Sequence, residues 1–190
     1  MTARDARLAL RVRITEIFHS LQGEAASVGS PTVFVRLTGC PLRCSYCDTA
    51  YAFHGGTMRT LADVLAEVAR YPARHVCVTG GEPLAQGEAC RALLALLCEH
   101  GYAVSLETGG ALSIAEIDAR VSRVVDLKTP GSGEVVRNDW ANLDLLTAHD
   151  QIKCVLSDRV DYEWAAEQVR TRDLGARCTV WFLSLIHISE

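Results

Sequence analysis

From residue 32 onward the chain alternates short apolar runs with longer runs whose apolar residues recur at helical spacing. This alternation predicts six strands with five helices between them, after an N-terminal segment of β character at 11–18. The expected strands are 32–37, 76–78, 103–106, 124–127, 151–156 and 179–183; the expected helices are 61–70, 88–100, one opening at a capping box at 113–116, 140–148 and 161–170. Strict alternation implies parallel strands with right-handed crossovers, and so an α/β fold that is either an open doubly wound sheet or a complete or partial barrel.

Length and composition limit the class of protein further. The chain has 190 residues, 49% hydrophobic and 22% charged, which predicts a single folded domain over 1–190 and excludes a disordered or low-complexity chain. The formal net charge is −4 and there is no basic run, so we expect no direct nucleic-acid binding. The longest apolar stretch, 92–98, is far shorter than the ~20 residues that cross a bilayer. With no secretion signal at the N-terminus, we expect a cytoplasmic protein without a membrane partner.

The chemically unusual residues follow the predicted strands. A loop with three cysteines follows the first, Gly80-Gly81-Glu82-Pro83 follows the second, Glu107 follows the third, and Asp126-Leu127-Lys128 stands at the fourth. The carboxyl ends of parallel strands meet at one edge of the sheet. The sequence therefore predicts that these residues converge on one rim.

The cysteine loop has the spacing Cys40-x3-Cys44-x2-Cys47. A structural zinc site needs four protein ligands, and an electron-transfer iron–sulfur centre normally uses four thiolates, whereas this loop supplies three. A redox dithiol would leave Cys40 without a role. We therefore interpret the loop as the holder of a [4Fe-4S] cluster whose fourth iron stays open to a small molecule. The other five cysteines are scattered among apolar residues and are interpreted as small buried hydrophobes: Cys77, Cys90, Cys98, Cys154 and Cys178.

The motif Cys40-x3-Cys44-x-aromatic-Cys47, followed by Gly80-Gly81-Glu82-Pro83, resembles the radical S-adenosylmethionine (SAM) superfamily. Within it, the chain resembles the 7-carboxy-7-deazaguanine synthase family of queuosine and 7-deazapurine biosynthesis. This narrower resemblance extends from about residue 14 to 182. It is carried by Phe18-His-Ser-Leu21-Gln22-Gly23-Glu24, by residues 38–49, by Glu107-Thr108-Gly109 and by Asp126-Leu127-Lys128-x-Pro130.

The resemblance implies a cofactor site for SAM beside the cluster. Tyr46 is placed for its ring and backbone to meet the adenine, and Gly80-Gly81 permits a close backbone approach. The residues carried over as cofactor-binding are Tyr46, Cys47, Asp48, Gly81, Glu82, Asp126, Leu127 and Lys128. A solvated role for Lys128 stays open. The resemblance also implies Mg²⁺ at Thr49, which the residues alone would not suggest.

The family's reaction implies a pterin substrate, 6-carboxy-5,6,7,8-tetrahydropterin, and a radical carbon–nitrogen lyase. The substrate carboxylate needs a fork of donors, which Arg36 supplies from within an apolar strand, and its amino and ring N–H edge needs a bidentate acceptor, which Glu107 fits. A solvated Arg36 and a capping Glu107 stay open as alternatives. Further contacts are expected from Leu21, Gln22, Gly23 and Thr79. A flavodoxin- or ferredoxin-type reductant and a homodimer are implied by the family alone.

The chain departs from the family's pattern in two places. Ala25 stands where the family has glycine, which costs on the order of 1 kcal/mol if that position needs φ > 0. The last residues, 184–190, do not open the helix that the family places there, and we expect them to be a non-native tail. The expected fold is thus a partial (βα)6-type barrel of parallel strands that lacks its last helix and leaves one flank of the final strand uncovered.

Two other functions stay open at this point. A glycyl-radical-enzyme activase shares the cysteine spacing but has no need of Arg36 and Glu107 as small-molecule contacts. A non-catalytic iron–sulfur module would need the cysteines alone.

Overall fold

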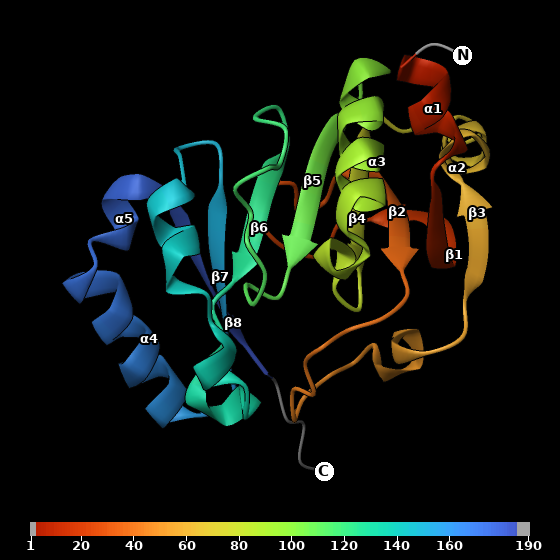
Figure 1. Ribbon diagram of the computed structural model, residues 1–190. Coiled ribbons are helices and arrows are strands. Elements are labelled where there is room, and N and C mark those ends of the chain that lie inside the picture. Colours follow the sequence, from red (N-terminus) through yellow and green to blue (C-terminus); the bar gives the residue numbers. More distant parts are fainter. Residues whose placement is uncertain (1–2, 186–190) are drawn as a thin grey trace.

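The computed structural model describes residues 3–185 and contains one eight-stranded sheet (Figure 1). The strands lie side by side in the order β3-β1-β2-β4-β5-β6-β7-β8. Their bounds are β1 Arg11–Leu21, β2 Pro31–Leu37, β3 Thr57–Thr60, β4 His75–Gly80, β5 Ala103–Thr108, β6 Ser122–Asp126, β7 Gln151–Leu156 and β8 Thr179–Ser184. The sheet is open, with β3 and β8 at its two edges.

Five α-helices and five short 3₁₀ helices connect the strands within the described residues. The α-helices are α1 Ala3–Ala9, α2 Leu61–Val68, α3 Gly87–Glu99, α4 Arg159–Thr171 and α5 Leu174–Arg177. The 3₁₀ helices are η1 Ala50–Phe53, η2 Pro83–Gln86, η3 Pro130–Ser132, η4 Val135–Arg137 and η5 Trp140–Leu145. Thr60 caps α2, because its side chain accepts a hydrogen bond from Asp63 N.

The predicted α/β fold with a mostly parallel sheet is confirmed. From β2 through β4, β5, β6 and β7 to β8, each neighbouring pair is parallel. The N-terminal part departs from strict alternation, because β1 pairs antiparallel with both β2 and β3. β3 has the sequence Thr-Met-Arg-Thr, which carries no apolar run and therefore does not predict a strand.

Two helix predictions are wrong. Residues 113–116 form turns, in which Ala115 N donates to Ser113 Oγ at 3.3 Å. Ile114, which follows the expected cap, donates its buried N–H to Asn142 Oδ1 at 3.0 Å, so a tertiary hydrogen bond holds this non-helical segment. The expected helix at 140–148 is the shorter η5, whose first turn is capped by Asp139.

The two faces of the sheet differ in chemistry because successive side chains of a strand point to opposite sides. One face carries fully buried aliphatic residues that pack with α2 and α3; they include Val33, Val35, Leu37, Val78, Leu106 and Ile152. We call the other side the polar face. It carries the side chains that alternate with these, including Arg36, Thr79, Glu107 and Lys153. Figure 1 shows α3 on the near side of the sheet.

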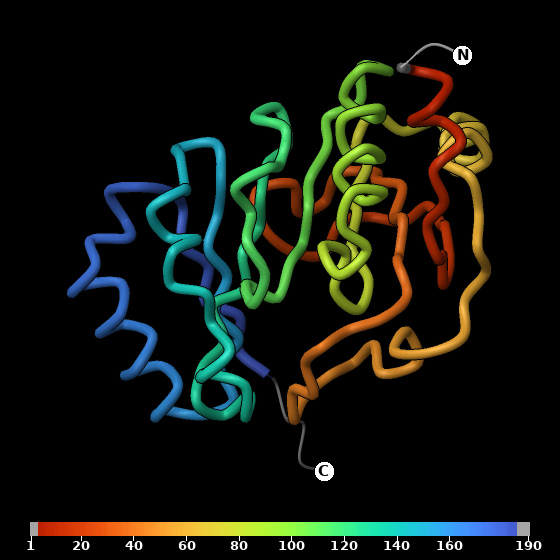
Figure 2. The backbone as a smooth tube through the Cα atoms, viewed as in Figure 1, coloured from red at the N-terminus to blue at the C-terminus, as the bar shows by residue number. Residues whose placement is uncertain are grey.

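A segment that we call the strap, residues 22–30, joins β1 to β2 and passes behind β5 and β6 as viewed in Figure 2. Gln22 and Ser30 close its base, with Gln22 N donating to Ser30 O at 2.9 Å. Gly29 N also donates to Gln22 O, at 2.7 Å. Ala25 is buried and has φ of +61°. This position therefore has a positive φ, which an alanine adopts here and which a glycine would adopt without strain.

The C-terminal strand β8 ends at Ser184, one residue before the end of the described part. Ser184 is the first residue of the expected tail 184–190, and it pairs with Leu156 in the sheet. Leu185 follows the strand, and its N–H donates to Leu156 O at 2.9 Å. Residues 186–190 lie outside the described part. Within 3–185 no helix follows β8, and no helix has the length and apolar character needed to span a membrane.

Candidate active site

The cysteine loop, residues 38–49, leaves the carboxyl end of β2 and extends beyond that end of the sheet (Figure 1). Its start is fixed by the end of β4, because Gly81 N donates to Leu37 O at 3.1 Å and Glu82 N donates to Gly39 O at 2.7 Å. A Cβ on Gly81 would stand 2.3 Å from Gly39 O. The close backbone approach that the glycines predict is therefore used, in this structure, by the cysteine loop itself.

The far part of the loop is fixed by the segment after β6. Ser45 N donates to Ser132 O at 3.0 Å, and Ser45 Oγ donates to Gly131 O at 2.6 Å. Between the cysteines, Cys47 N donates to Cys44 O at 3.1 Å. The loop that would hold a cluster is thus held by hydrogen bonds at its start, to the end of β4, and at Ser45, to the segment after β6.

Cys40, Cys44 and Cys47 are free and partly exposed. Partial burial raises the pKa of the Cys40 and Cys44 thiols, whereas the Lys128 ammonium acts to lower it. Within residues 3–185 no three His, Cys, Asp or Glu side chains gather tightly enough to hold one metal ion. The ligands of a cubane each bind a different iron atom, so three thiols spread along one loop fit a cluster better than a single ion.

A group of polar side chains faces this loop from the end of β6. Asp126 Oδ2 accepts from Lys128 Nζ at 2.7 Å, and both side chains are buried. Within residues 3–185 two buried side-chain polar atoms have no hydrogen bond of regular geometry: Asp126 Oδ1 and the Tyr46 hydroxyl. The Thr129 side chain lies near this hydroxyl and acts to lower its pKa. Burial, with the nearby Asp126 carboxylate, raises the pKa of Tyr46 to about 12. Because buried polar atoms normally have partners, this pair beside the cysteines fits a bound polar cofactor.

Glu82 is fully buried and its oxygens are already used by the protein. It accepts hydrogen bonds from Leu84 N at 3.0 Å, Thr108 Oγ1 at 2.9 Å and Gly109 N at 2.7 Å. Burial raises the pKa of this carboxyl in spite of those bonds. Glu82 therefore links the ends of β4 and β5 beneath the loop, and its direct contact with a cofactor stays a prediction.

Three of the predicted substrate residues meet on the polar face. Gln22 Nε2 donates to Glu107 Oε1 at 3.2 Å, and Thr79 Oγ1 donates to Glu107 Oε2 at 3.1 Å. They come from the strap, β4 and β5, so the fold assembles them from segments far apart in the sequence. Glu107 is held by hydrogen bonds from these neutral donors, and the Lys153 ammonium lies near enough to interact with its charge.

Arg36 lies beside this trio, since it is the register partner of Thr79 across β2 and β4. Its Nε donates to Glu16 Oε1 at 2.7 Å, and its guanidinium lies 5.8 Å from the Phe18 ring centre and 5.9 Å from that of Tyr51. Arg36 is thus on the polar face, as the substrate role requires, and it already has a carboxylate partner.

The remaining predicted residues are spread around the rim. Leu21 is exposed at the end of β1, and Gly23 is exposed in the strap. The Leu127 side chain belongs to the hydrophobic core, and its N–H donates to Lys153 O at 2.8 Å, so a contact of its backbone with a cofactor stays a prediction. Asp48 is exposed, and Thr49 Oγ1 lies 3.9 Å from Cys47 Sγ.

Sequence reasoning missed three charged residues of the polar face: Lys153, Glu24 and Glu16, the partner of Arg36. Lys153 Nζ lies 2.6 Å from Glu24 Oε2. The signal that singles out Arg36, a charge within an otherwise apolar strand, is equally present for Lys153 in Gln-Ile-Lys-Cys-Val-Leu. Glu24 lies within the motif that carries the family resemblance but was given no role there.

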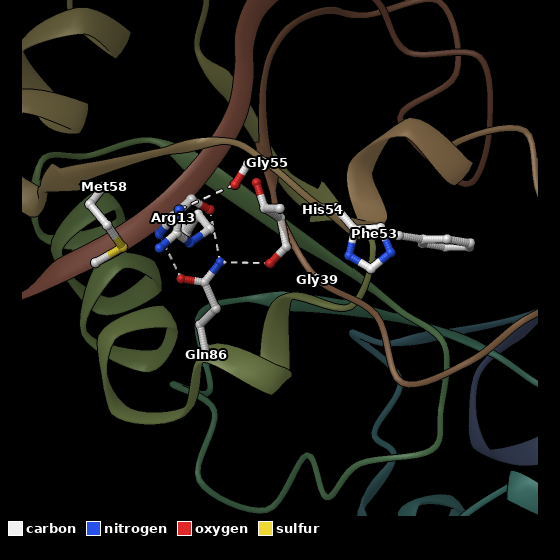
Figure 3. A pocket seen from close by; sticks show the side chains of 8 residues that line it. Arg13, Gly39, Phe53, His54, Gly55, Met58 and Gln86 are labelled. Carbon is white, nitrogen blue, oxygen red and sulfur yellow. Dashed lines mark hydrogen bonds between the residues drawn. The ribbon is translucent and has the colours of Figure 1, made fainter.

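A cavity of about 560 Å³ lies outside this site, beside the start of the cysteine loop (Figure 3). Its walls are Arg13, Thr38, Gly39, Phe53, His54, Gly55, Met58 and Gln86. Gln86 is a further residue that sequence reasoning missed. Its side chain accepts from Arg13 N at 2.7 Å and donates to Arg13 O at 2.8 Å and Thr38 O at 3.1 Å, which ties η2 to β1 and to the base of the loop.

Comparisons with known proteins agree with this geometry. A family model described as the radical SAM superfamily matches residues 34–179. The 7-carboxy-7-deazaguanine synthase of Koribacter versatilis is 45% identical over 164 residues, covering 86% of this chain and 73% of the relative. That of Chlorobaculum tepidum is 39% identical over 174 residues, covering 90% and 79%.

Two solved structures share the fold. QueE from Escherichia coli superposes with a TM-score of 0.79 at 24% identity, covering 97% of this chain and 89% of that one. TYW1 with a lysine-pyruvate adduct bound gives 0.61 at 14% identity, covering 83% and 65%. With three cysteines on a loop at the carboxyl rim and unpartnered polar atoms beside them, the chain belongs to the radical SAM superfamily and, within it, to the 7-carboxy-7-deazaguanine synthase family.

Proposed function

We propose that this chain converts 6-carboxy-5,6,7,8-tetrahydropterin into 7-carboxy-7-deazaguanine with loss of ammonia, as a radical SAM carbon–nitrogen lyase. The observation that supports this best is the state of Glu107. The other carboxylates of the polar face, Glu16, Glu24 and Asp126, are each paired with a cation. Glu107 instead accepts from the neutral donors Gln22 and Thr79.

Glu107 is hydrogen-bonded by neutral donors, and the Lys153 ammonium, whose pKa the charge of Glu107 helps to raise, lies nearby. The remaining lone pairs of Glu107 suit a ligand rich in N–H donors. The amino group and ring N–H of a pterin present two parallel donors, which a carboxylate accepts in a bidentate manner. Gln22 and Thr79 hold Glu107 in one orientation for this contact. Exposed backbone groups of Leu21 and Gly23 at the mouth of the site complete the recognition of the substrate.

The substrate carboxylate is assigned to Arg36. A guanidinium has five N–H donors, and the bond to Glu16 uses Nε, so the terminal nitrogens keep donors for a second carboxylate. We assign Mg²⁺ to Thr49, with the substrate carboxylate and water as its other oxygen ligands. Phe18 and Tyr51 limit the movement of Arg36, which favours one direction of approach.

Cys40, Cys44 and Cys47 would hold the cluster, and Tyr46 and the unpartnered Asp126 Oδ1 would meet SAM. When bound, the cluster supplies the single electron that cleaves SAM to a 5′-deoxyadenosyl radical. Tyr46 would lie against the adenine, and Lys128 would hold Asp126 in place. The other cofactor contacts are assigned to Cys47, Asp48, Gly81, Glu82 and the Leu127 backbone. The Gln22–Thr79–Glu107 trio would keep the pterin on the polar face, beneath the rim that carries the cysteine loop.

The remaining assignments follow from this chemistry. We assign the chain 1–190 to a single radical SAM domain that takes electrons from a flavodoxin- or ferredoxin-type protein and works as a homodimer. All eight cysteines are free, which suits a reducing compartment, so we place the enzyme in the cytoplasm.

Anaerobic turnover tests the proposed function. The protein, reconstituted with iron and sulfide and reduced with dithionite, is incubated with SAM and with or without the carboxytetrahydropterin, and products are separated by liquid chromatography and mass spectrometry. We expect 5′-deoxyadenosine and 7-carboxy-7-deazaguanine when the pterin is present. Cleavage of SAM that ignores the pterin would favour a glycyl-radical-enzyme activase, and no cleavage would favour a non-catalytic module.

A further inference from the structure

The strap is tied across the polar face to β7. Glu24 Oε2 lies 2.6 Å from Lys153 Nζ, and Ala26 N donates to Gln151 Oε1 at 2.7 Å. Gln151 Oε1 also accepts from Trp181 Nε1 at 2.8 Å, which extends the connection to β8. The strap therefore closes one side of the polar face, as its course in Figure 2 also shows.

A continuous series of polar contacts runs from Lys153 to the predicted substrate residues. Lys153 binds the Glu24 carboxylate, and the backbone N–H of Glu24 donates to Gln22 Oε1 at 3.2 Å. Gln22 Nε2 then donates to Glu107 Oε1 at 3.2 Å, and the other Glu107 oxygen accepts from Thr79. The series joins β7, the strap, β5 and β4.

The contact between Glu24 and Gln22 decides which way the Gln22 amide points. Because Gln22 Oε1 accepts from the Glu24 N–H, the NH2 group is the end that faces Glu107. In the reverse orientation the amide oxygen would face the carboxylate, and the two acceptors would repel each other. The position of Glu24 therefore fixes the Gln22 amide as the donor in its hydrogen bond with Glu107.

Lys153 is the fixed end of this series. Its side chain is 12% exposed, and burial would lower its pKa, but the carboxylates of Asp126, Glu107 and Glu24 outweigh burial and raise the pKa above the ordinary lysine value. Lys153 thus remains an ammonium group at neutral pH. The Glu24 side chain is 41% exposed, so water competes with Lys153 for its carboxylate. The contact with Lys153 holds the strap in place against this competition.

We propose that Lys153 is a positioning residue for the substrate: through Glu24 it holds the strap so that Gln22 presents its amide to Glu107. The inference rests on the proposed function, because the ligand whose binding it improves is the carboxytetrahydropterin. It assigns Lys153 no contact with SAM or the cluster. The effect of losing it should therefore fall on pterin binding more than on SAM binding, to which Lys153 is linked only through its neighbour Asp126.

A double-mutant cycle tests this. Dissociation constants for the carboxytetrahydropterin and for SAM are measured by anaerobic calorimetry on reconstituted wild type, Lys153→Met, Glu24→Gln and the double variant. We expect Lys153→Met to weaken pterin binding about tenfold and Glu24→Gln several-fold, in keeping with the loss of a charge-assisted contact. The double variant should be no weaker than Lys153→Met, since both act through one contact. SAM binding should change less than about twofold.

Matched variants and a second readout separate positioning from a general loss of structure. Lys153→Arg keeps the charge and should restore pterin binding, and Glu163→Gln, which removes an exposed ion pair with Arg159 on α4, should change nothing. Hydrogen exchange of the Gly29 amide, which donates to Gln22 O, should accelerate in Lys153→Met.

Each contrary outcome has a distinct meaning. Wild type that fails to bind the pterin contradicts the proposed function. Wild type that binds it, while Glu24→Gln binds equally well or the two substitutions add independently, overturns the positioning role. Glu24 is partly exposed and its substitution should not disturb folding, so this arm stands even where Lys153→Met folds poorly.

Discussion

The two faces of the sheet show how one strand serves both folding and chemistry. On β5, Leu106 is fully buried against the helix side, while its neighbour Glu107 joins Gln22 and Thr79 on the polar face. Burying a leucine side chain stabilises a fold by roughly 1.5–3 kcal/mol. A buried charged group gains much less, because desolvation offsets its contacts. The comparison teaches that stability is carried by one face and ligand recognition by the other, one residue apart.

Removal of a cluster ligand should have the largest effect and should fall on chemistry alone. Cys44→Ala takes a thiol from a loop at the carboxyl rim, outside the apolar face. We expect loss of the iron–sulfur absorbance and of all turnover, with the free energy of unfolding of the apoprotein nearly unchanged. Iron content and denaturant unfolding measure the two quantities, and full iron retention would contradict the ligand set.

A second substitution asks whether buried charge by itself marks a functional site. Asp150 is buried at the amino end of β7 and accepts from Arg123 Nε at 2.8 Å and Thr147 N at 2.8 Å. Burial raises the pKa of Asp150, but the bonds from Arg123 and Thr147 outweigh it, and the pKa lies below its ordinary value of about 3.8. Asp150→Asn should cost about 3–5 kcal/mol of stability at neutral pH and leave pterin affinity intact.

The pH dependence of this effect has a definite sign. A carboxyl whose folded-state pKa is lowered stabilises the fold fully above its ordinary pKa, and the stabilisation is lost as pH falls through the folded-state pKa. The gap between wild type and Asp150→Asn should therefore narrow below about pH 3.8. Urea unfolding at several pH values checks this, and a gap that widens in acid would contradict it.

Leu106→Ala tests the apolar face directly. Truncating a fully buried leucine should reduce the free energy of unfolding by roughly 2–5 kcal/mol through lost burial and the cavity left behind. The protein that remains folded should bind the pterin as wild type does. Thermal unfolding with a parallel titration of the pterin provides both values, and a large change in affinity with little loss of stability would reverse the assignment of the faces.

Glu107→Gln is the partner experiment on the polar face. It replaces the anionic acceptor by an amide of the same size, so pterin affinity should fall about 30-fold, in line with roughly 2 kcal/mol for bonds to a charged group. The free energy of unfolding should change by less than about 1 kcal/mol. Unchanged pterin binding would remove Glu107 from the substrate site.

The smallest effect concerns the strap. Ala25 adopts φ of +61°, which glycine tolerates without a steric penalty. Ala25→Gly should stabilise the protein by up to about 1 kcal/mol, and Ala25→Val should destabilise it by at least as much. Denaturant midpoints measured side by side decide this, and a midpoint that falls in the glycine variant would show that the buried methyl group matters more than the backbone strain.

The features predicted correctly from the sequence are those that depend on local patterns. Apolar runs predicted the strands β2, β4, β5, β6, β7 and β8. The ends of these runs predicted that the cysteine loop follows β2 and that Glu107 lies near the carboxyl end of β5. The roles of the individual site residues remain predictions, although the fold brings Gln22, Thr79 and Glu107 into contact.

What escaped prediction depends on contacts between distant segments. β3 forms because its backbone pairs with β1, and its own sequence carries no strand pattern. The capping box at 113–116 opens no helix, and its segment is held by a contact with a distant residue, in which Ile114 N donates to Asn142 Oδ1. The partnership of Glu24 with Lys153 spans more than half of the chain, and no local signal pairs two such residues.

The polar face can perform radical chemistry only if the loop at its rim leaves one iron without a protein ligand. Electron paramagnetic resonance of the reduced, reconstituted protein, recorded before and after addition of SAM, examines that iron directly. We predict that SAM changes the spectrum of the cluster, since its amino and carboxylate groups would bind an iron that no side chain occupies. Identical spectra at saturating SAM would contradict the account.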